Sequence, residues 1–311
     1  MVKKNLKLGN FLKMNKSIKQ NVLPLISACI WGTAFVVQDT ASSHVSPFAF
    51  NALRSIVAVI FLLMLTLILK NFKSKEKIEE NKNDVKSLII GGIMCGSCLF
   101  LATNLQQIGI TKGTSGGKAG FITAIYMVIV PIIGIFLKKK NGLNVLFAVV
   151  LALVGLYLLC ITNGFNFAVS DLYVLGCAFA FAIHILVIDY YGNKTDGIML
   201  SLVQFFVNAV LSAIFCLIFE IGQPFDFSKI IGAILFVGIL SSGVAYTLQI
   251  IAQKGTNPTI VSILLSTESF FAIIAQAIIT KEFLTLREYV GCAIILLAVL
   301  LTQINFTKKN N

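Results

Sequence analysis

Charge is scarce in this chain. Only 12% of its residues are charged, 57% are hydrophobic, and the mean hydropathy is +0.91. Soluble globular proteins carry about 25% charged residues, so this composition falls far outside their range. The few charges also avoid the long apolar stretches. The composition therefore excludes an ordinary soluble domain and indicates an integral membrane protein.

Signatures of several other protein classes are missing as well. The sequence has no Gly-x4-Gly-Lys-Ser/Thr loop, which excludes an ATP-driven pump. All seven cysteines lie in apolar runs, so they give no support to a disulfide framework. Cys95 and Cys98 are one helical turn apart, but no histidine or further cysteine is near enough to complete a metal site. No basic patch with interleaved aromatic residues suggests nucleic-acid binding. We expect no cofactor, no metal and no obligate protein partner.

Long apolar segments dominate what is present. A helix rises about 1.5 Å per residue, so a hydrocarbon core of about 30 Å needs about 20 apolar residues. Ten segments meet this length: 21–39, 48–69, 87–107, 115–137, 144–162, 171–190, 198–219, 230–251, 258–280 and 286–304. The polar stretches between them are short. We therefore predict an all-α integral membrane protein with ten transmembrane helices and no soluble domain.

The basic residues predict the orientation. If the N-terminus is cytoplasmic, nineteen of the 25 lysines and arginines fall on the cytoplasmic side and four on the other, while Arg54 and Lys118 lie within helices. Both termini are then cytoplasmic: a basic segment, 1–20, and a tail, 306–311. The first apolar segment is long enough to span and has no small-residue cleavage site after it, so we expect it to be retained. The net charge of +12 then suits the anionic inner leaflet of a plasma or inner membrane.

An eight-residue motif occurs twice. Gln107-Ile-Gly-Ile-Thr-Lys-Gly-Thr114 returns 142 positions later as Gln249-Ile-Ile-Ala-Gln-Lys-Gly-Thr256, each time between two apolar segments. Because each half then holds five helices, an odd number, the second half enters the membrane in the opposite direction. We predict inverted repeats at 21–162 and 171–305, a feature of secondary transporters. In each motif we expect glycine to take the left-handed conformation and threonine to cap the following helix.

Several motifs resemble those of the EamA-type transporters of the drug/metabolite transporter superfamily. They are Trp31-Gly-Thr-Ala-Phe35, Pro47 with Arg54, Ala245-Tyr-x-Leu-Gln249 running into Pro258-Thr259, Ser266-Thr-Glu268, and Lys281-Glu-Phe-Leu-Thr285. The resemblance covers nearly the whole chain. Two positions depart from it: Ser269 stands where many relatives have proline, and Lys281 where glycine is usual.

This resemblance implies a ten-helix fold. Helices 1 to 4 and 6 to 9 would line a central cavity, with the fifth and tenth helices outside it. It also implies export of small metabolites, often amino acids. Independently, inverted-repeat carriers bind their substrates near the membrane midplane, where the halves meet. We therefore predict a secondary carrier that works by alternating access on a small-molecule substrate.

Three charged residues inside apolar segments are candidates for function. Glu268 lies ten residues into its segment, about 15 Å from the inner end. A carboxylate there is costly unless it is paired, hydrated or protonated, so it is a candidate to bind a substrate amine or to carry a coupling proton. Lys118 is placed either to bind a substrate carboxylate or to snorkel to the outer interface. Arg54 always carries its proton, and we expect it to be structural, with a partner such as Asp39.

Neutral polar and aromatic residues complete the candidate set. Amides in membrane helices either bind substrate or join helices, and aromatic rings either stack on a substrate or pack. His184 is a candidate proton relay. The remaining candidates are Gln107, Gln249, Asn104, Tyr246, Gln204, Asn208, Trp31 and Tyr126.

Two alternatives to a carrier stay open at this stage. The first is a channel or lipid scramblase, which needs no alternating access. The second is an intramembrane serine protease, because Gly113-x-Ser115-x-Gly117 matches a serine-nucleophile motif and His184 lies in another helix. Against the protease, Ser115 corresponds to Asn257 of the second copy and falls in a turn that helix capping already explains.

Overall fold

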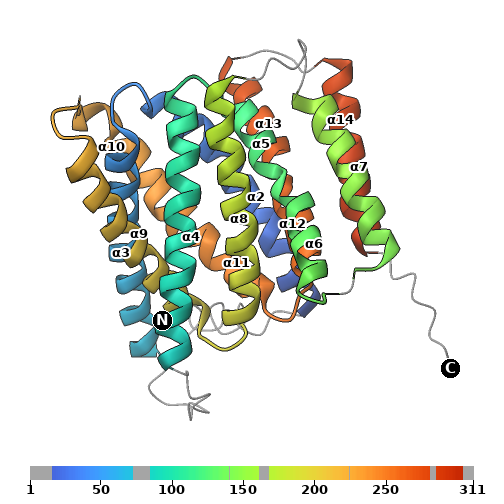
Figure 1. Cartoon of the computed structure of the whole chain (residues 1–311), viewed down its shortest axis with the longest axis horizontal. Helices are drawn as coiled ribbons and strands as arrows, with labels where there is room; N and C mark the ends of the chain where they lie inside the picture. Colours follow the sequence, from blue (N-terminus) through green and yellow to red (C-terminus); the bar gives the residue numbers. More distant parts are fainter. Residues whose placement is uncertain are drawn as a thin grey trace.

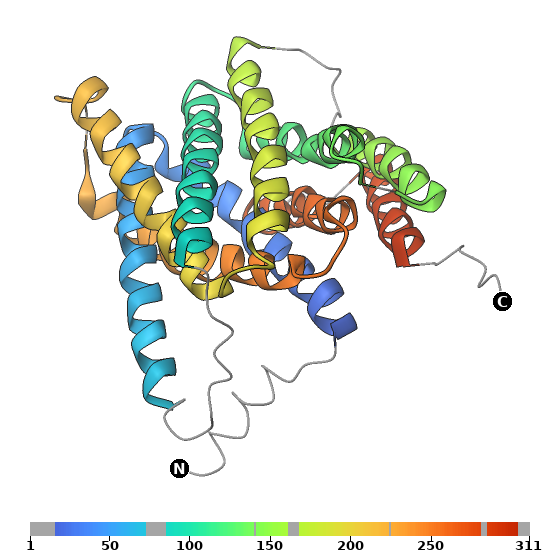
Figure 2. The same cartoon turned by 60° about the horizontal axis from the view of Figure 1, so that its bottom comes forward.

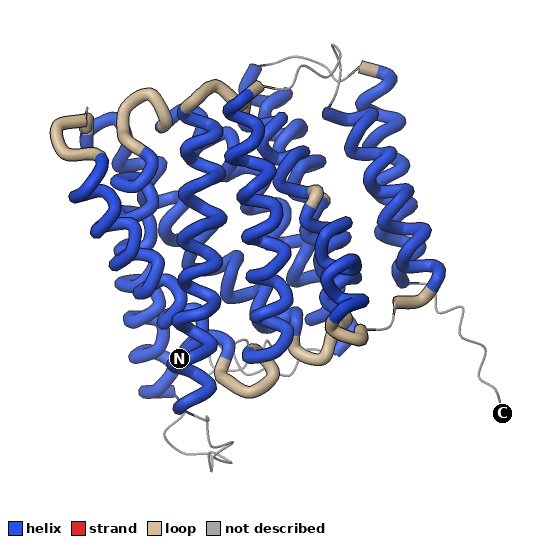
Figure 3. Tube along the Cα trace, in the orientation of Figure 1, coloured by secondary structure: helices blue, strands red, loops and turns tan. Residues whose placement is uncertain are grey.

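A computed structural model describes residues 16–72, 85–139, 141–160, 168–223, 225–280 and 285–303. In these residues every regular element is a helix, and the loops gather at the two ends of the helix bundle (Figure 3). Residues 1–15 of the predicted basic segment and the predicted tail, 306–311, lie outside the described residues.

All ten predicted segments are helical, with ends within five residues of the prediction. Seven of them are single α-helices: α2 (Lys16–Ala41), α3 (Pro47–Phe72), α4 (Val85–Thr111), α7 (Leu143–Cys160), α8 (Val169–Tyr191), α9 (Gly197–Phe219) and α14 (Leu286–Gln303). Among the described residues, eight helical stretches are long and apolar enough to cross a membrane, and α7 is a shorter apolar helix. The count of ten membrane spans stays a prediction.

Three segments that we predicted as single helices are interrupted, so that expectation is wrong. Residues 116–136 form α5 (Gly116–Ala124) and α6 (Tyr126–Phe136). Residues 258–280 form α12 (Pro258–Ser266) and α13 (Glu268–Thr280). Residues 227–253 form α10 (Phe227–Phe236), the π-helix η1 (Val237–Ala245) and α11 (Tyr246–Gln253). The breaks at Ile125 and Thr267 are 142 residues apart, which is also the spacing of the repeated motif.

Side-chain hydroxyls compete for backbone carbonyls at the second break. Ser266 Oγ donates to Ile263 O at 2.8 Å, and Thr267 Oγ1 donates to Leu264 O at 2.6 Å. Such bonds to the preceding turn bend helices. Near the first break, Ser269 Oγ donates to Gly120 O at 2.8 Å, so the residue that replaces the expected proline ties α13 to α5.

The helices form a bundle with a separate pair at one edge (Figures 1 and 2). Helices α7 and α14 pack against each other at that edge, and α3, α9 and α10 lie at the opposite one. Between them are α2, α4, α8, α11 and the two interrupted spans α5–α6 and α12–α13. Glycines allow the closest approaches: a Cβ atom at Gly155 of α7 would lie 2.9 Å from Gly291 O of α14.

The two repeated motifs form turns with glycine in the left-handed conformation, which confirms that prediction. The φ angle is +109° at Gly113 and +69° at Gly255. The predicted threonine caps are wrong. Thr114 Oγ1 donates to Asp171 Oδ1 at 2.9 Å, and Thr256 Oγ1 donates to Ala252 O at 2.7 Å. The N-cap positions belong instead to the next residues, Ser115 and Asn257.

Gly113→Ala is expected to destabilise the protein by about 1–2 kcal/mol, because an L-residue in the left-handed region meets its own carbonyl. No atom lies within 4 Å of the added Cβ, so backbone strain alone is tested. Thermal unfolding of the detergent-solubilised protein measures it. Gly117→Ala is the control, since its Cβ also meets no atom within 4 Å and its φ is not positive. Equal melting temperatures for both variants would contradict the prediction.

Candidate functional site

A central pocket lies where the interrupted helices meet the other helices. No described residue of α7 or α14 lines it. Six of the predicted candidates do: Trp31, Arg54, Tyr126, Tyr246, Gln249 and Glu268.

The two helix breaks bring a tyrosine and a carboxyl group together in this pocket. Tyr126 is the first residue of α6, and Glu268 is the first residue of α13. The Tyr126 hydroxyl donates a hydrogen bond to Glu268 Oε1 at 3.0 Å, and both residues are buried. Interrupted membrane helices at corresponding positions of two halves are a strong indication of a substrate site.

Glu268 is buried in the pocket and has few polar partners. No ion pair joins Glu268 to a lysine, arginine or histidine of the described chain. Its position in the first turn of α13 places it near unpaired backbone N–H groups and the positive end of the helix dipole. The carboxyl group therefore has one hydrogen-bond donor and a favourable helix end, and it lacks a counter-ion.

Arg54 brings a permanent positive charge to the same pocket. It is 2% exposed, and its Nη1 donates to Gln38 Oε1 at 2.7 Å. The expected partner, Asp39, is not the one found: Asp39 Oδ2 accepts from Gly116 N at 3.1 Å. Among the described residues, Arg54 Nε and Gln249 Oε1 have no hydrogen-bond partner although both are buried. Because buried polar groups normally have partners, these two atoms leave a donor and an acceptor for a ligand.

Aromatic residues and the π-helix form another wall of the pocket. The rings of Trp31 and Tyr246 lie with centroids 4.6 Å apart. Trp31 Nε1 donates to Ser241 O at 3.4 Å, and Ser27 Oγ donates to Ala245 O at 2.9 Å. Both acceptors belong to η1, so side chains of α2 satisfy carbonyl groups of the wider helix. Short π-helical segments are frequent at functional sites.

Other candidates lie outside the pocket and hold helices together. Lys118 forms an ion pair with Asp171 at 2.5 Å. Gln107 Nε2 donates to Gln38 O at 3.5 Å. Asn104 and Asn208 belong to a chain of hydrogen bonds that joins α3, α4 and α9 through Asn51, Asn104, Ser212, Asn208 and Ser55. Hydrogen bonds of this kind join membrane helices.

The remaining two candidates contact each other. His184 Nε2 and Gln204 Oε1 are 3.0 Å apart, and both residues are fully buried. The protease arrangement is not assembled. Ser115 directly follows Thr114, which contacts Asp171, whereas His184 lies thirteen residues further along α8. At about 1.5 Å per residue, that separation is about 20 Å along the helix.

Several residues that line the pocket were not among those predicted from the sequence. Gln38, Gln106, Phe181, Ile185 and Ser241 also line the pocket. Two of them are direct neighbours of predicted candidates: Gln38 precedes Asp39, and Gln106 precedes Gln107. One residue along a helix turns the side chain by about 100°, since a turn holds 3.6 residues. An assignment of the inward face of α2 and α4 would have found both glutamines.

Comparisons with known proteins agree on one family. Residues 19–161 and 168–304 each match the EamA-like transporter family. An "Uncharacterized transporter" of Archaeoglobus fulgidus is 32% identical over 285 residues, covering 89% of this chain and 83% of that protein. The "Uncharacterized transporter YwfM" of Bacillus subtilis is 26% identical over 289 residues, covering 89% and 90%. A crystal structure of a protein whose description gives no function has a TM-score of 0.73 at 16% identity, covering 91% of this chain and 96% of that one. At this identity the likeness shows the fold alone.

Proposed function

Because this chain belongs to the EamA-like transporter family, we propose that it is a secondary carrier that exports a small organic metabolite, such as an amino acid, by alternating access. The chain is a multi-pass membrane protein with transporter relatives. The carrier would reside in the plasma or inner membrane with both termini in the cytoplasm, as the distribution of basic residues suggests.

One observation carries this proposal: a carboxyl group and a guanidinium group line the same pocket without forming an ion pair. Glu268 and Arg54 both line the pocket, and no ion pair joins them. A solute with an ammonium group and a carboxylate would contact Glu268 at one end and Arg54 at the other. Gln249 Oε1 would accept a further hydrogen bond from the ammonium group, and Arg54 Nε would donate to the carboxylate.

The interrupted helices support alternating access. Helices α5 and α6 meet at Ile125, and α12 and α13 meet at Thr267, beside the Tyr126–Glu268 hydrogen bond. In inverted-repeat carriers, one repeat or bundle rocks against the other around the bound substrate. Glu268 would then bind the substrate amine in one direction of the cycle and release it, or take up a proton, in the other.

Counterflow in proteoliposomes tests this function. Liposomes preloaded with one unlabelled solute are diluted into the same labelled solute at two pH values. The panel contains neutral amino acids, the amine that each gives on decarboxylation, and the acid that each gives on loss of the amino group. We expect saturable counterflow for a zwitterion and weaker transport of its two single-charge relatives, since each of them leaves one buried charge unpaired.

The same experiment separates a carrier from a pore. A channel or scramblase gives flux that does not saturate and no counterflow. Protein-free liposomes and liposomes that carry Glu268→Gln protein are the controls. Counterflow that favours a solute with a single charge would contradict the proposal that the substrate is a zwitterion, but it would still support a carrier.

A further inference from the structure

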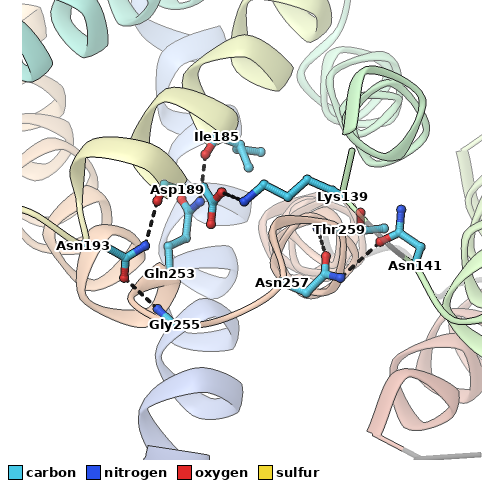
Figure 4. A network of polar contacts seen from close by, with 9 residues as sticks. All are labelled: Lys139, Asn141, Ile185, Asp189, Asn193, Gln253, Gly255, Asn257 and Thr259. Carbon is cyan, nitrogen blue, oxygen red and sulfur yellow. Dashed lines mark hydrogen bonds and ion pairs between the residues drawn. The ribbon is translucent and has the colours of Figure 1, made fainter. Parts of the chain in front are cut away.

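A polar network joins the ends of four helices at one end of the bundle (Figure 4). Lys139 Nζ contacts Asp189 Oδ2 at 2.5 Å, which ties the end of α6 to the end of α8. Asn257 Nδ2 donates to Asn141 Oδ1 at 3.1 Å, so the start of α12 is tied to the chain that follows α6. Gly255 N donates to Asn193 Oδ1 at 2.9 Å, which links the loops after α11 and α8.

This network lies directly beyond the pocket. Ile185 lines the pocket, and its carbonyl oxygen accepts a hydrogen bond from Gln253 Nε2 at 2.9 Å. Asp189 is four residues further along α8, about one helical turn. The network therefore separates the pocket from this end of the bundle, which is the cytoplasmic end in the proposed orientation.

A second lysine–aspartate pair ties the same two spans at the opposite end. Lys118, near the start of α5, pairs with Asp171 near the start of α8. The two lysines thus stand on either side of the break at Ile125. Helix α5 is held to α8 by one pair, and α6 is held to α8 by the other.

The two ion pairs differ in burial and in the number of contacts. The Asp171 side chain is 0% exposed and also accepts hydrogen bonds from Thr114 Oγ1 and Ala168 N. In the other pair the Lys139 side chain is 44% exposed and the Asp189 side chain 9%, against 25% and 0% for Lys118 and Asp171. Lys139 is the described side chain that contacts the Asp189 carboxylate. Exposed ion pairs contribute little, whereas removing a partner of a buried one is costly. The Lys139–Asp189 pair is therefore the weaker of the two.

The backbone at the end of α6 directs Lys139 toward α8. Lys138 has a φ of +58°, and it has the only positive φ among the described non-glycine residues. Lys139 N donates to Gly134 O at 2.8 Å, which closes the turn. A non-glycine residue in the left-handed region is uncommon, and such strain often marks functional sites.

We propose that this network is the gate between the pocket and the cytoplasmic end, and that rupture of the Lys139–Asp189 pair opens it. Helix α6 swings about Ile125, while Lys118 and Asp171 keep α5 fixed to α8. The proposal rests on the proposed carrier function, because a gate that opens once per cycle needs a contact weak enough to break and specific enough to reform.

Access of a thiol reagent to the pocket tests the gate without any substrate. Ser241→Cys, which replaces one atom of a pocket residue, is introduced into a variant whose native cysteines are replaced by serine or alanine. A membrane-impermeant maleimide is then applied to inverted membrane vesicles, which expose the cytoplasmic face. Lys139→Gln and Asp189→Asn are each expected to raise the labelling rate by about twofold or more, since the pair they remove is partly exposed.

An ion pair outside the network provides the control. Lys229→Gln removes an exposed ion pair with Asp226 and should leave the labelling rate unchanged. The gate is wrong if the two neutralising variants label at the parent rate.

A variant with the two charges exchanged tests the gate if a single variant fails to fold. Lys139→Asp combined with Asp189→Lys should return the labelling rate toward that of the parent, and a rate as high as in Asp189→Asn would overturn the proposal. Because the labelling assay uses no solute, a result that contradicts the gate does not affect the counterflow test of the carrier function. A counterflow screen that finds no substrate likewise does not affect the labelling result.

Discussion

Glu268→Gln is expected to abolish transport or to uncouple it from protons, while the protein still inserts and folds. Glutamine has nearly the same shape, and its carbonyl oxygen still accepts the hydrogen bond from Tyr126. What is lost is the negative charge that would bind an ammonium group or carry a proton. Hydrogen bonds to charged groups contribute about 1.5–3 kcal/mol, which is about 10- to 100-fold in affinity.

Counterflow at two pH values measures this effect. Glu288→Gln is the matched control, because Glu288 lies in the first turn of α14, outside the pocket, and bonds to Thr285. The control should transport like the parent protein. Elution of both variants as a single symmetric peak shows that folding is intact. If Glu268→Gln transports at the parent rate and with the parent dependence on pH, Glu268 neither binds the substrate nor carries the coupling proton.

Gly32→Ala is expected to lose stability and transport together. A Cβ atom at Gly32 of α2 would lie 2.5 Å from Phe271 Cβ, 2.6 Å from Ala272 N and 2.6 Å from Glu268 O. Two of these three atoms are backbone of α13, which no change of side-chain rotamer can move away. Helix α13 must shift as a whole, and Glu268 shifts with it. Overpacking of this kind costs about 1–3 kcal/mol, occasionally more.

A second helical glycine provides the control for Gly32→Ala. At Gly232 of α10 an added Cβ meets no atom within 4 Å. Gly232→Ala should therefore leave transport unchanged and raise the melting temperature, since alanine favours a helix over glycine by about 1 kcal/mol. Thermal unfolding and counterflow are measured for both variants. A Gly32→Ala protein that melts and transports like Gly232→Ala would contradict the packing argument.

The positions of the helices were predictable because they depend on a local quantity. Apolar length alone located segments such as 258–280, which matches the bounds of α12 and α13 together. The left-handed glycines were predictable for the same reason, since Lys-Gly-Thr between two apolar runs is a turn signal. Neither inference needs to know which helices are neighbours.

The breaks and the inward faces were not predictable, because they depend on contacts between helices. The segment 115–137 gave no sign of a break at Ile125, where the bond from Ser269 to Gly120 O lies close by. Likewise, Lys118 was predicted as a possible substrate ligand, because the sequence does not show that Asp171, 53 residues away, lies beside it. Six of the candidates nevertheless line the pocket, because residues that are polar at mid-membrane depth are costly anywhere else.

The hydrogen bond between Tyr126 and Glu268 says something about how such a chain could arise. Tyr126 and Glu268 are 142 residues apart, which is the spacing of the repeated motif, so they occupy corresponding positions in the two halves. Their side chains are joined by a hydrogen bond. In a symmetric dimer of two half-length chains, a residue on the two-fold axis meets its own copy. A carboxyl group at this position would then face a second carboxyl group and be repelled by it. When the two halves are joined in one chain, corresponding positions can hold different residues. The carboxyl group of Glu268 can then have a neutral hydroxyl partner, Tyr126, which a symmetric pair of identical chains could not supply.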